Sequence, residues 1–185
     1  MRLTVYTDYS LRLLIFAALK PDRLINISEV AEAYGISRNH LTKVVHQLGI
    51  AGYLETVRGK GGGLRLARPP QAIRVGDVVR HTEPDMAITP CFRPLNAPCV
   101  ILPACLLKTV LHDARDAFLR VLDGYTLADL TAATPSLLSL LGQSGGGSAK
   151  ALPWPAGGKP VGTLPVVGIP GAAEGGAEFV LSDRV

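Results

Sequence analysis

The sequence predicts a mainly α-helical fold with a small β-wing, that is, a winged helix-turn-helix unit followed by a long helix of the kind that forms dimers. Three observations support this prediction. Residues 38–48 have the apolar spacing of one helical face, residues 59–63 are four glycines and a lysine between two strand-like segments, and residues 105–123 repeat apolar side chains at helical spacing.

Two helices are expected before residues 38–48. The first runs from about Thr7 or Asp8 to Lys20, where a Pro-Asp pair ends it. The second covers residues 27–34, with Asn26 or Ser28 as its N-cap. A Gly-Ile turn then leads into the next helix, which is the arrangement of a helix-turn-helix.

Residues 38–48 are predicted to form the recognition helix, with Ser37 as its N-cap. Its apolar positions recur at helical spacing and should face the core: Leu41, Val44, Val45 and Leu48. Its other positions hold side chains that can donate to phosphates or to base edges in a major groove: Arg38, Asn39, Thr42, Lys43 and His46. The alternative is an ordinary solvated helix with a basic face.

The wing is predicted from strands at residues 54–58 and 64–67, which flank the glycine-rich turn. Glycines let the backbone approach a phosphate closely, and Arg58, Lys60 and Arg65 can neutralise backbone charge or enter a minor groove. A nucleotide-binding P-loop is excluded, because that loop needs Lys-Ser or Lys-Thr leading into a helix, and here strands flank the glycines.

After the wing, a short helix is expected over residues 76–83, an irregular loop over residues 85–104, and a helix from Cys105 to about Asp123. The apolar stripe of that last helix is too long for one winged-helix unit to cover, so a helix of a second subunit is expected to pack on it. Thr126 should cap a short helix that ends at Leu130, and residues 137–141 should add a weak turn.

The predicted domain organisation has three parts. Residues 2–130 hold the winged helix-turn-helix, the loop and the dimerisation helix, and residues 131–141 extend this domain. Residues 142–185 contain 16 Gly or Pro among 44 positions, which predicts a disordered tail. Two apolar stretches of the tail, residues 164–167 and 179–181, are the candidates for binding a partner protein, and the favoured alternative is an unstructured tail without a partner.

Charge and targeting signals limit the partners of the chain. Between Arg38 and Arg80 there are eight Arg or Lys but only two Asp or Glu, which indicates a polyanionic partner. The sequence has no signal peptide and no apolar run long enough to span a membrane, so a cytoplasmic protein without membrane contact is expected. An electron-transfer enzyme is disfavoured, because the sequence has no acid–base constellation and no second cofactor motif.

The three cysteines, Cys91, Cys99 and Cys105, lie within 15 residues. They lack the C-x-x-C pairs of zinc sites, and three thiolates in a proline-rich loop suit an iron–sulfur cluster. A thiol switch and inert cysteines remain alternatives. A fourth ligand would be another residue type. His112 is disfavoured, because it lies two helical turns from Cys105, and the ordinary role of Asp8 is a negative charge at a helix N-terminus.

Several motifs of the chain resemble those of one family, the winged-helix iron–sulfur regulators, which include the nitric-oxide-sensing NsrR group and the IscR group. The resemblance extends to about Leu141, or about three quarters of the chain. The matching segments are MRLTVYTDYSLRLL, ISEVAEAYGISRNHLTK, VRGKGGGLRLARP, IRVGDVVRHTEP, PAC at the third cysteine and YTLADL. IscR-like members carry a histidine three residues after the last cysteine, where this chain has Lys108, so the NsrR group is the better match.

This resemblance implies a homodimer that binds a palindromic operator in double-stranded DNA. It also implies an iron–sulfur cluster, [4Fe–4S] in preference to [2Fe–2S], held by Cys91, Cys99 and Cys105, with Asp8 as the fourth ligand. Positions that match the family's DNA contacts are Ser37, Asn39, Thr42 and Arg58. The complete set of predicted DNA-binding residues is Ser28, Ser37, Arg38, Asn39, Thr42, Lys43, His46, Arg58, Lys60, Gly61 and Arg65.

The implied function is a transcriptional repressor that leaves its operator when nitric oxide reacts with the cluster. The alternative is an IscR-like or thiol-based regulator that senses iron–sulfur status or oxidative stress. Neither is an enzyme.

Overall fold

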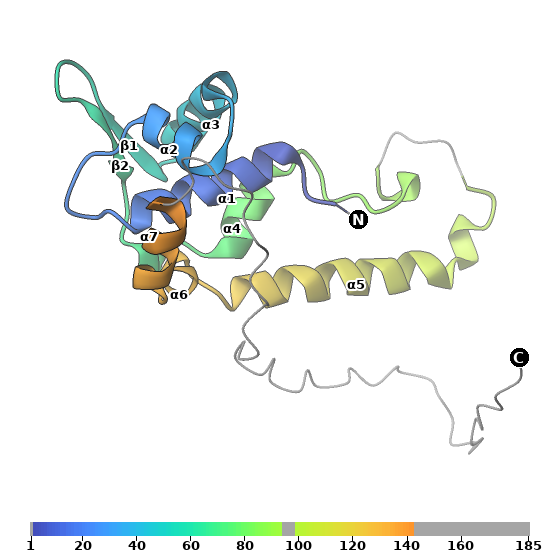
Figure 1. The fold of residues 1–185 in the computed structure, drawn as a ribbon. Coiled ribbons are helices and arrows are strands. Elements are labelled where there is room, and N and C mark those ends of the chain that lie inside the picture. Colours follow the sequence, from blue (N-terminus) through green and yellow to red (C-terminus); the bar gives the residue numbers. More distant parts are fainter. Residues whose placement is uncertain (1, 94–98, 143–185) are drawn as a thin grey trace, which may run out of the picture. The chain divides into compact units, whose positions relative to one another are not determined.

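A computed structural model of the chain describes residues 2–93 and 99–142 (Figure 1). Apart from Gly142, the predicted tail with its two apolar stretches lies outside these residues. The elements follow in the order α1 (Val5–Ala18), α2 (Ile27–Tyr34), α3 (Arg38–Ile50), β1 (Leu54–Val57), β2 (Gly63–Leu66), α4 (Val75–Thr82), α5 (Leu106–Asp123), α6 (Leu127–Leu130) and α7 (Thr134–Gly142). Short 3-10 helices are η1 (Pro70–Ala72), η2 (Pro90–Phe92) and η3 (Leu102–Ala104). The chain is therefore mostly helical with one small antiparallel sheet, as predicted.

The first helix begins earlier than expected. Helix α1 starts at Val5, and its N-cap is Thr4, whose hydroxyl accepts a hydrogen bond from the Thr7 backbone N–H at 3.2 Å. The predicted start at Thr7 or Asp8 is wrong by two to three residues, because Thr4 satisfies a helix N–H that would otherwise lack a partner. The helix also ends at Ala18, two residues before the predicted end at Lys20.

The helix-turn-helix forms as predicted. Asn26, not Ser28, is the N-cap of α2, and it makes a capping box with Glu29: the Glu29 N–H donates to the Asn26 side chain at 2.9 Å. Gly35 ends α2 with a φ of 65°, a left-handed conformation that glycine adopts without strain. Ser37 stands at the N-cap position of α3 but makes no capping hydrogen bond with its side chain.

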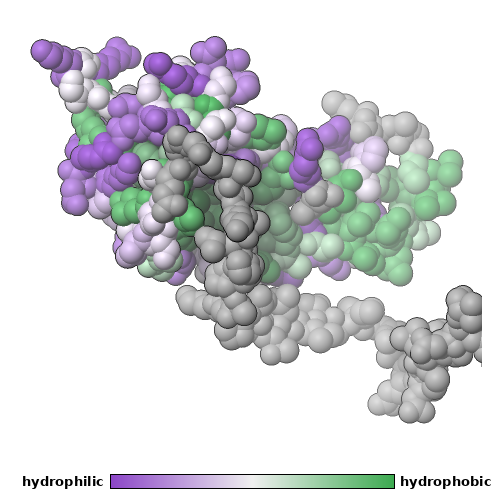
Figure 2. All heavy atoms as spheres, in the orientation of Figure 1, coloured by the Kyte–Doolittle hydropathy of each residue, from purple (hydrophilic) through white to green (hydrophobic). Residues whose placement is uncertain are grey.

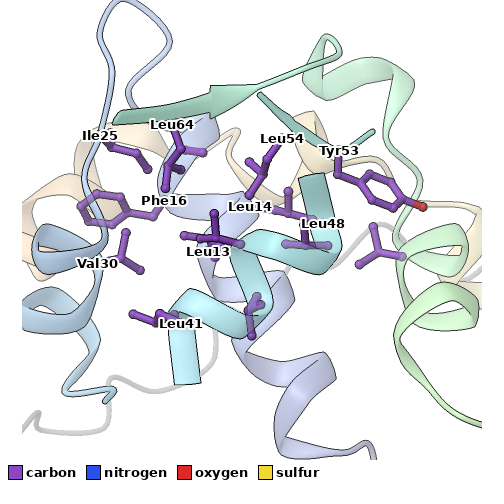
Figure 3. Packing of buried hydrophobic residues seen from close by; sticks show 14 of the residues in the cluster. Leu13, Leu14, Phe16, Ile25, Val30, Leu41, Leu48, Tyr53, Leu54 and Leu64 are labelled. Atoms are coloured by element: carbon purple, nitrogen blue, oxygen red, sulfur yellow. The ribbon is translucent and has the colours of Figure 1, made fainter. Parts of the chain in front are cut away.

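The core lies between α1, α3 and the sheet, and Figure 3 shows its side chains converging. Leu13 and Leu14 of α1 meet Leu48 of α3 there, each with no exposed surface. The four apolar positions predicted for α3 are all buried, which confirms the assignment of its inner face. Burying each such side chain contributes roughly 1.5–3 kcal/mol, so this face fixes the orientation of α3.

The wing is a two-stranded antiparallel sheet in which Leu54 pairs with Leu66 and Val57 with Gly63. Each strand is four residues long, so β1 ends one residue earlier than predicted and β2 begins and ends one residue earlier. The segment before α2 joins the sheet through a bridge between Ile25 and Leu64. This bridge ties strand β2 to the segment that leads into the helix-turn-helix.

Helices α4 and α5 are joined by an ion pair. The guanidinium of Arg80 donates to both carboxylate oxygens of Asp123, at 2.7 and 2.6 Å, and this hydrogen bonding lowers the pKa of Asp123. Gly76 of α4 leaves room for the pair, because a Cβ there would lie 1.9 Å from an Asp123 oxygen. We call residues 85–105, which lie between these helices, the cysteine segment.

Three boundaries near the cysteine segment differ from the predictions. Helix α4 spans Val75–Thr82, one residue earlier than predicted at each end, and Cys105 is the N-cap of α5 instead of its first residue. The expected irregular loop contains the short helices η2 and η3, and the expected weak turn at residues 137–141 belongs to the nine-residue helix α7. Thr126 caps α6 with a capping box, as predicted. Across the residues that the structure describes, no helix is long and apolar enough to cross a bilayer.

Candidate nucleic-acid interface and cysteine segment

Helix α3 presents one polar face to solvent. Every residue predicted to contact DNA from this helix is exposed: Arg38, Asn39, Thr42, Lys43 and His46. The Thr42 hydroxyl donates to the Arg38 carbonyl at 2.9 Å, so a contact from Thr42 to DNA would use its methyl group or its hydroxyl oxygen as an acceptor. Ser28 on α2 and Ser37 before α3 are also exposed. The face is thus free to meet a polyanion, and its contacts with DNA stay predictions.

The wing tip is a tight turn made by glycines. The Gly62 N–H donates to the Gly59 carbonyl at 2.9 Å, and Gly61 has a φ of 80°, which is the pattern of a type II turn. Arg58, Lys60 and Gly61 are all exposed at this tip. Because Gly62 carries no Cβ, the Val57 carbonyl can lie where a side chain would clash at 2.3 Å. The glycines therefore determine how closely the two strands approach at the tip.

Arg65 differs from the other wing residues because it already has an anionic partner. Its Nε lies 3.0 Å from a carboxylate oxygen of Glu55, the residue opposite it in the sheet. This hydrogen bond lowers the pKa of Glu55 and raises the pKa of Arg65. A DNA phosphate would have to compete with Glu55 for Arg65, which residue-type reasoning about Arg65 alone did not anticipate.

A groove of about 470 Å³ lies between α3 and β1. Its lining includes Thr42 and His46 from the polar face of α3, Thr56 from β1 and the exposed apolar side chain of Ile50. Figure 2 shows largely hydrophilic surface over the elements α2, α3 and the wing. The recognition helix and the wing thus border one continuous surface.

The cysteine segment holds all three cysteines of the chain, and each is a free thiol. Cys91 is half-buried in η2, where its Sγ lies 3.1 Å from the Thr89 hydroxyl, while Cys99 is exposed and Cys105 is half-buried at the start of α5. Residues 94–98 lie outside the described residues, and within the described ranges no three His, Cys, Asp or Glu side chains form a metal-binding group.

Three contacts hold the part of this segment around Cys91. The Phe92 ring stacks on His112 of α5 with centroids 4.0 Å apart and planes 15° apart, and the Arg115 guanidinium lies 5.6 Å from the Phe92 centroid. Arg93 pairs with Asp85 at 2.9 Å and closes the loop that contains Cys91. His112, which the sequence analysis disfavoured as a ligand, is the packing partner of Phe92, the residue next to Cys91.

Asp8 lies in the first turn of α1, as a negative charge at a helix N-terminus would. Its carboxylate pairs with Arg12 one turn later at 2.9 Å, and both side chains are about half-exposed. The described residues do not bring Asp8 together with the three cysteines. Its role as a cluster ligand stays a prediction.

Comparison with known proteins decides the family. The model of the Rrf2 family, described as iron-dependent transcriptional regulators, matches residues 3–133. The chain belongs to the Rrf2 family. It is therefore a DNA-binding transcriptional regulator and not an enzyme.

Relatives in the Rrf2 family match over most of the chain. The HTH-type transcriptional regulator NsrR of Bacillus subtilis is 54% identical over 142 residues, which covers 76% of this chain and 97% of that protein. NsrR of Geobacillus kaustophilus is 50% identical over the same shares. Two solved structures are similar in fold. The structure of CymR, the global cysteine regulator of B. subtilis, has a TM-score of 0.60 at 28% sequence identity and covers 72% of this chain and 98% of that one. The structure of T. potens IscR has a TM-score of 0.58 at 26% sequence identity and covers 72% of this chain and 88% of that one.

The resemblance identified from the motifs is thus confirmed at the level of the Rrf2 family and its NsrR-named relatives. Sequence reasoning missed Glu83, which accepts a hydrogen bond from the Thr4 N–H at the start of α1, and the Phe92–His112 stack. Both depend on pairs of residues far apart in the chain, so no local pattern pointed to them.

Proposed function

We propose that the chain is a homodimeric repressor whose operator binding depends on an iron–sulfur cluster and ends when nitric oxide reacts with that cluster. The observation that carries this proposal is the place of the three free thiols. They lie in the segment that joins α4, which packs on the DNA-binding unit, to α5, and a change in their ligation would therefore act on both.

The donor set fits such a cluster. Three thiolates are soft ligands of the kind that iron–sulfur clusters use, and neither Cys91, Cys99 nor Cys105 is bound in a disulfide. We assign Asp8, from α1 of the same or the partner subunit, as the fourth ligand, which binds through a carboxylate oxygen. To bind the cluster, Asp8 would have to break its ion pair with Arg12. When bound, a cluster of this class, with [4Fe–4S] as the expected form, supplies iron that reacts with nitric oxide.

Helix α5 supplies the dimer interface in this proposal. Within the described part of the chain none of its side chains is buried, and Leu106, Leu107 and Val110 are 74%, 62% and 52% exposed. Figure 2 shows hydrophobic surface gathered where α5 begins. A two-fold partner helix would cover this face and set the spacing of the two α3 helices on a palindrome.

The protein residues then act as follows. With the thiols and Asp8 ligated, the cysteine segment is held against α1 and α5, and the two α3 helices keep the half-site spacing. When the ligands are released, this restraint is lost. A differential affinity of a few kcal/mol between the two states is enough to empty the operator.

The test uses protein purified without air. We expect a coloured protein with iron and sulfide, which binds a palindromic duplex selected from a random-sequence library more tightly than the metal-free chain does, and which releases the duplex on addition of nitric oxide. Cys105→Ala should lose the colour, whereas Asp113→Asn, an exposed carboxylate of α5, should keep it. Persistent binding of the duplex in nitric oxide would refute the proposal.

An IscR-like or thiol-based sensor is the second candidate, and the exposure of Cys99 favours it, because an accessible thiol can be oxidised directly. The same protein treated with hydrogen peroxide separates the two. Release by peroxide in metal-free protein, without any response to nitric oxide, would support the thiol mechanism.

A further inference from the structure

One carboxylate joins the end of α4 to the beginning of α1. The Oε1 atom of Glu83 accepts hydrogen bonds from the Thr4 backbone N–H at 2.8 Å, the Thr4 hydroxyl at 3.2 Å and the Thr7 hydroxyl at 2.5 Å. Thr7 is completely buried, and Glu83 is half-buried. We call Glu83, Thr4 and Thr7 the Glu83 clamp.

The clamp stands at the point where the cysteine segment leaves the folded domain. Glu83 directly follows α4, and only Pro84 separates it from the segment. Beyond it, Met86 and Ile88 border a cavity of about 160 Å³ together with Leu3, so the start of the segment lies beside the N-terminal residues. A displacement of the segment would therefore act on α1 at Thr4 and Thr7, in addition to any direct ligation by Asp8.

On the α1 side, three consecutive residues have three different contacts. Thr7 binds Glu83, Asp8, the proposed cluster ligand, pairs with Arg12, and the Tyr9 ring lies beside His40 of α3 with centroids 6.1 Å apart. His40 lies in the first turn of the recognition helix. The clamp, the proposed ligand and a contact to the recognition helix thus lie within one turn of α1.

We propose that Glu83 is a positioning residue that transmits the ligation state of the cysteine segment to α1 and, through Tyr9 and His40, to the recognition helix. This inference rests on the proposed function. It differs from simple capping, in which a carboxylate near the N-terminus of α1 only stabilises that helix. Transmission requires that the clamp affect the difference between the cluster-bound and metal-free proteins, whereas capping affects both equally.

The test compares variants by one ratio, the operator affinity of the cluster-bound protein divided by that of the metal-free protein. Glu83→Ala should reduce this ratio at least 10-fold. Glu83→Gln keeps an oxygen that can accept the Thr4 and Thr7 bonds, and should retain the ratio within about 3-fold. Glu32→Ala, which removes an exposed carboxylate of α2, is the matched control and should leave it unchanged.

Thr7→Val provides a second route, because it removes one donor of the clamp and leaves the carboxylate in place. It should reduce the ratio in the same direction as Glu83→Ala. The absorption spectrum of the cluster should be the same in wild type and Glu83→Gln. A changed spectrum would mean that Glu83 is a ligand and would overturn the positioning role.

The outcomes separate the inference from the function on which it rests. A wild-type ratio of one refutes the cluster-dependent function itself. A large wild-type ratio that persists in Glu83→Ala and Thr7→Val, with only a lower melting temperature, shows capping and overturns the inference. If Glu83→Ala cannot hold the cluster, Thr7→Val decides: an unchanged ratio overturns transmission, and a reduced ratio supports it.

Discussion

Substituting Gly62 by alanine should separate the wing from the rest of the DNA-binding surface. A Cβ at Gly62 would lie 2.3 Å from the Val57 carbonyl oxygen and 2.9 Å from the Gly59 carbonyl oxygen. Ordinary contact begins at 3.4 Å, so the tip must open by about 1 Å. Both obstructing atoms belong to the backbone, and no side-chain rotation can relieve the clash.

The expected loss of affinity follows from the cations that the tip carries. If Arg58 and Lys60 each neutralise one phosphate, each makes the slope of log affinity against log salt steeper by about 0.9. At 0.1 M salt, relative to 1 M, this contributes roughly 8-fold in affinity per contact. Displacing both should weaken binding by about 60-fold per wing and lower the slope by about 1.8 per wing. The tip can open locally while the core stays folded, so the melting temperature should fall only slightly.

Fluorescence anisotropy with the selected duplex at several salt concentrations measures both quantities. Lys60→Ala removes one cation per wing without a backbone clash and should lower the slope by about 0.9 per wing. Gly142→Ala, where nothing lies within 4 Å of the added Cβ, is the control substitution. If Gly62→Ala binds DNA with the wild-type slope of log affinity against log salt, the wing does not contact phosphates, and the predicted DNA-binding surface is wrong at the wing.

Three further predictions concern the recognition helix and the α4–α5 junction. Lys43→Ala should lower the salt slope by about one unit per recognition helix without changing the preferred sequence in a selection from random duplexes, and an unaltered slope would contradict the phosphate contact. Gly76→Ala should lower the free energy of unfolding by roughly 1–3 kcal/mol in urea, because its Cβ would lie 1.9 Å from the Asp123 carboxylate; equal stability would show that the ion pair moves at little cost. The Arg80 hydrogen bonds lower the pKa of Asp123 in the folded protein, so its stabilisation is complete above the unfolded pKa of roughly 3.9 and is lost as pH falls below it. Asp123→Asn should therefore flatten the decline of stability in acid, and a parallel decline in both proteins would exclude this group as its cause.

Local patterns identified the DNA-binding unit well because their information lies within a few residues. The helical spacing of Leu41, Val44, Val45 and Leu48 placed the buried face of α3, and the glycines placed the turn of the wing. The motifs spread between Met1 and Leu141 were enough to indicate the family, and the Rrf2 match over residues 3–133 confirms it. The same local approach placed the start of α1 too late, although the capping bond from the Thr7 N–H to the Thr4 hydroxyl is itself local. Only the Glu83 carboxylate that accepts from the Thr4 N–H lies out of reach of a local pattern, 79 positions away.

By itself, the sequence determined which helical face is buried, where the wing turns and that three thiols lie in one short segment. Three contacts became visible only in the folded chain: the hydrogen bonds from Thr4 and Thr7 to Glu83, the ion pair between Glu55 and Arg65, and the stacking of Phe92 on His112. These two kinds of information differ in how far apart in the sequence the interacting residues lie. Helical periodicity and turn chemistry are set by neighbours within one or two turns, whereas a hydrogen bond between residues 76 positions apart exists only once the core has brought α4 against α1.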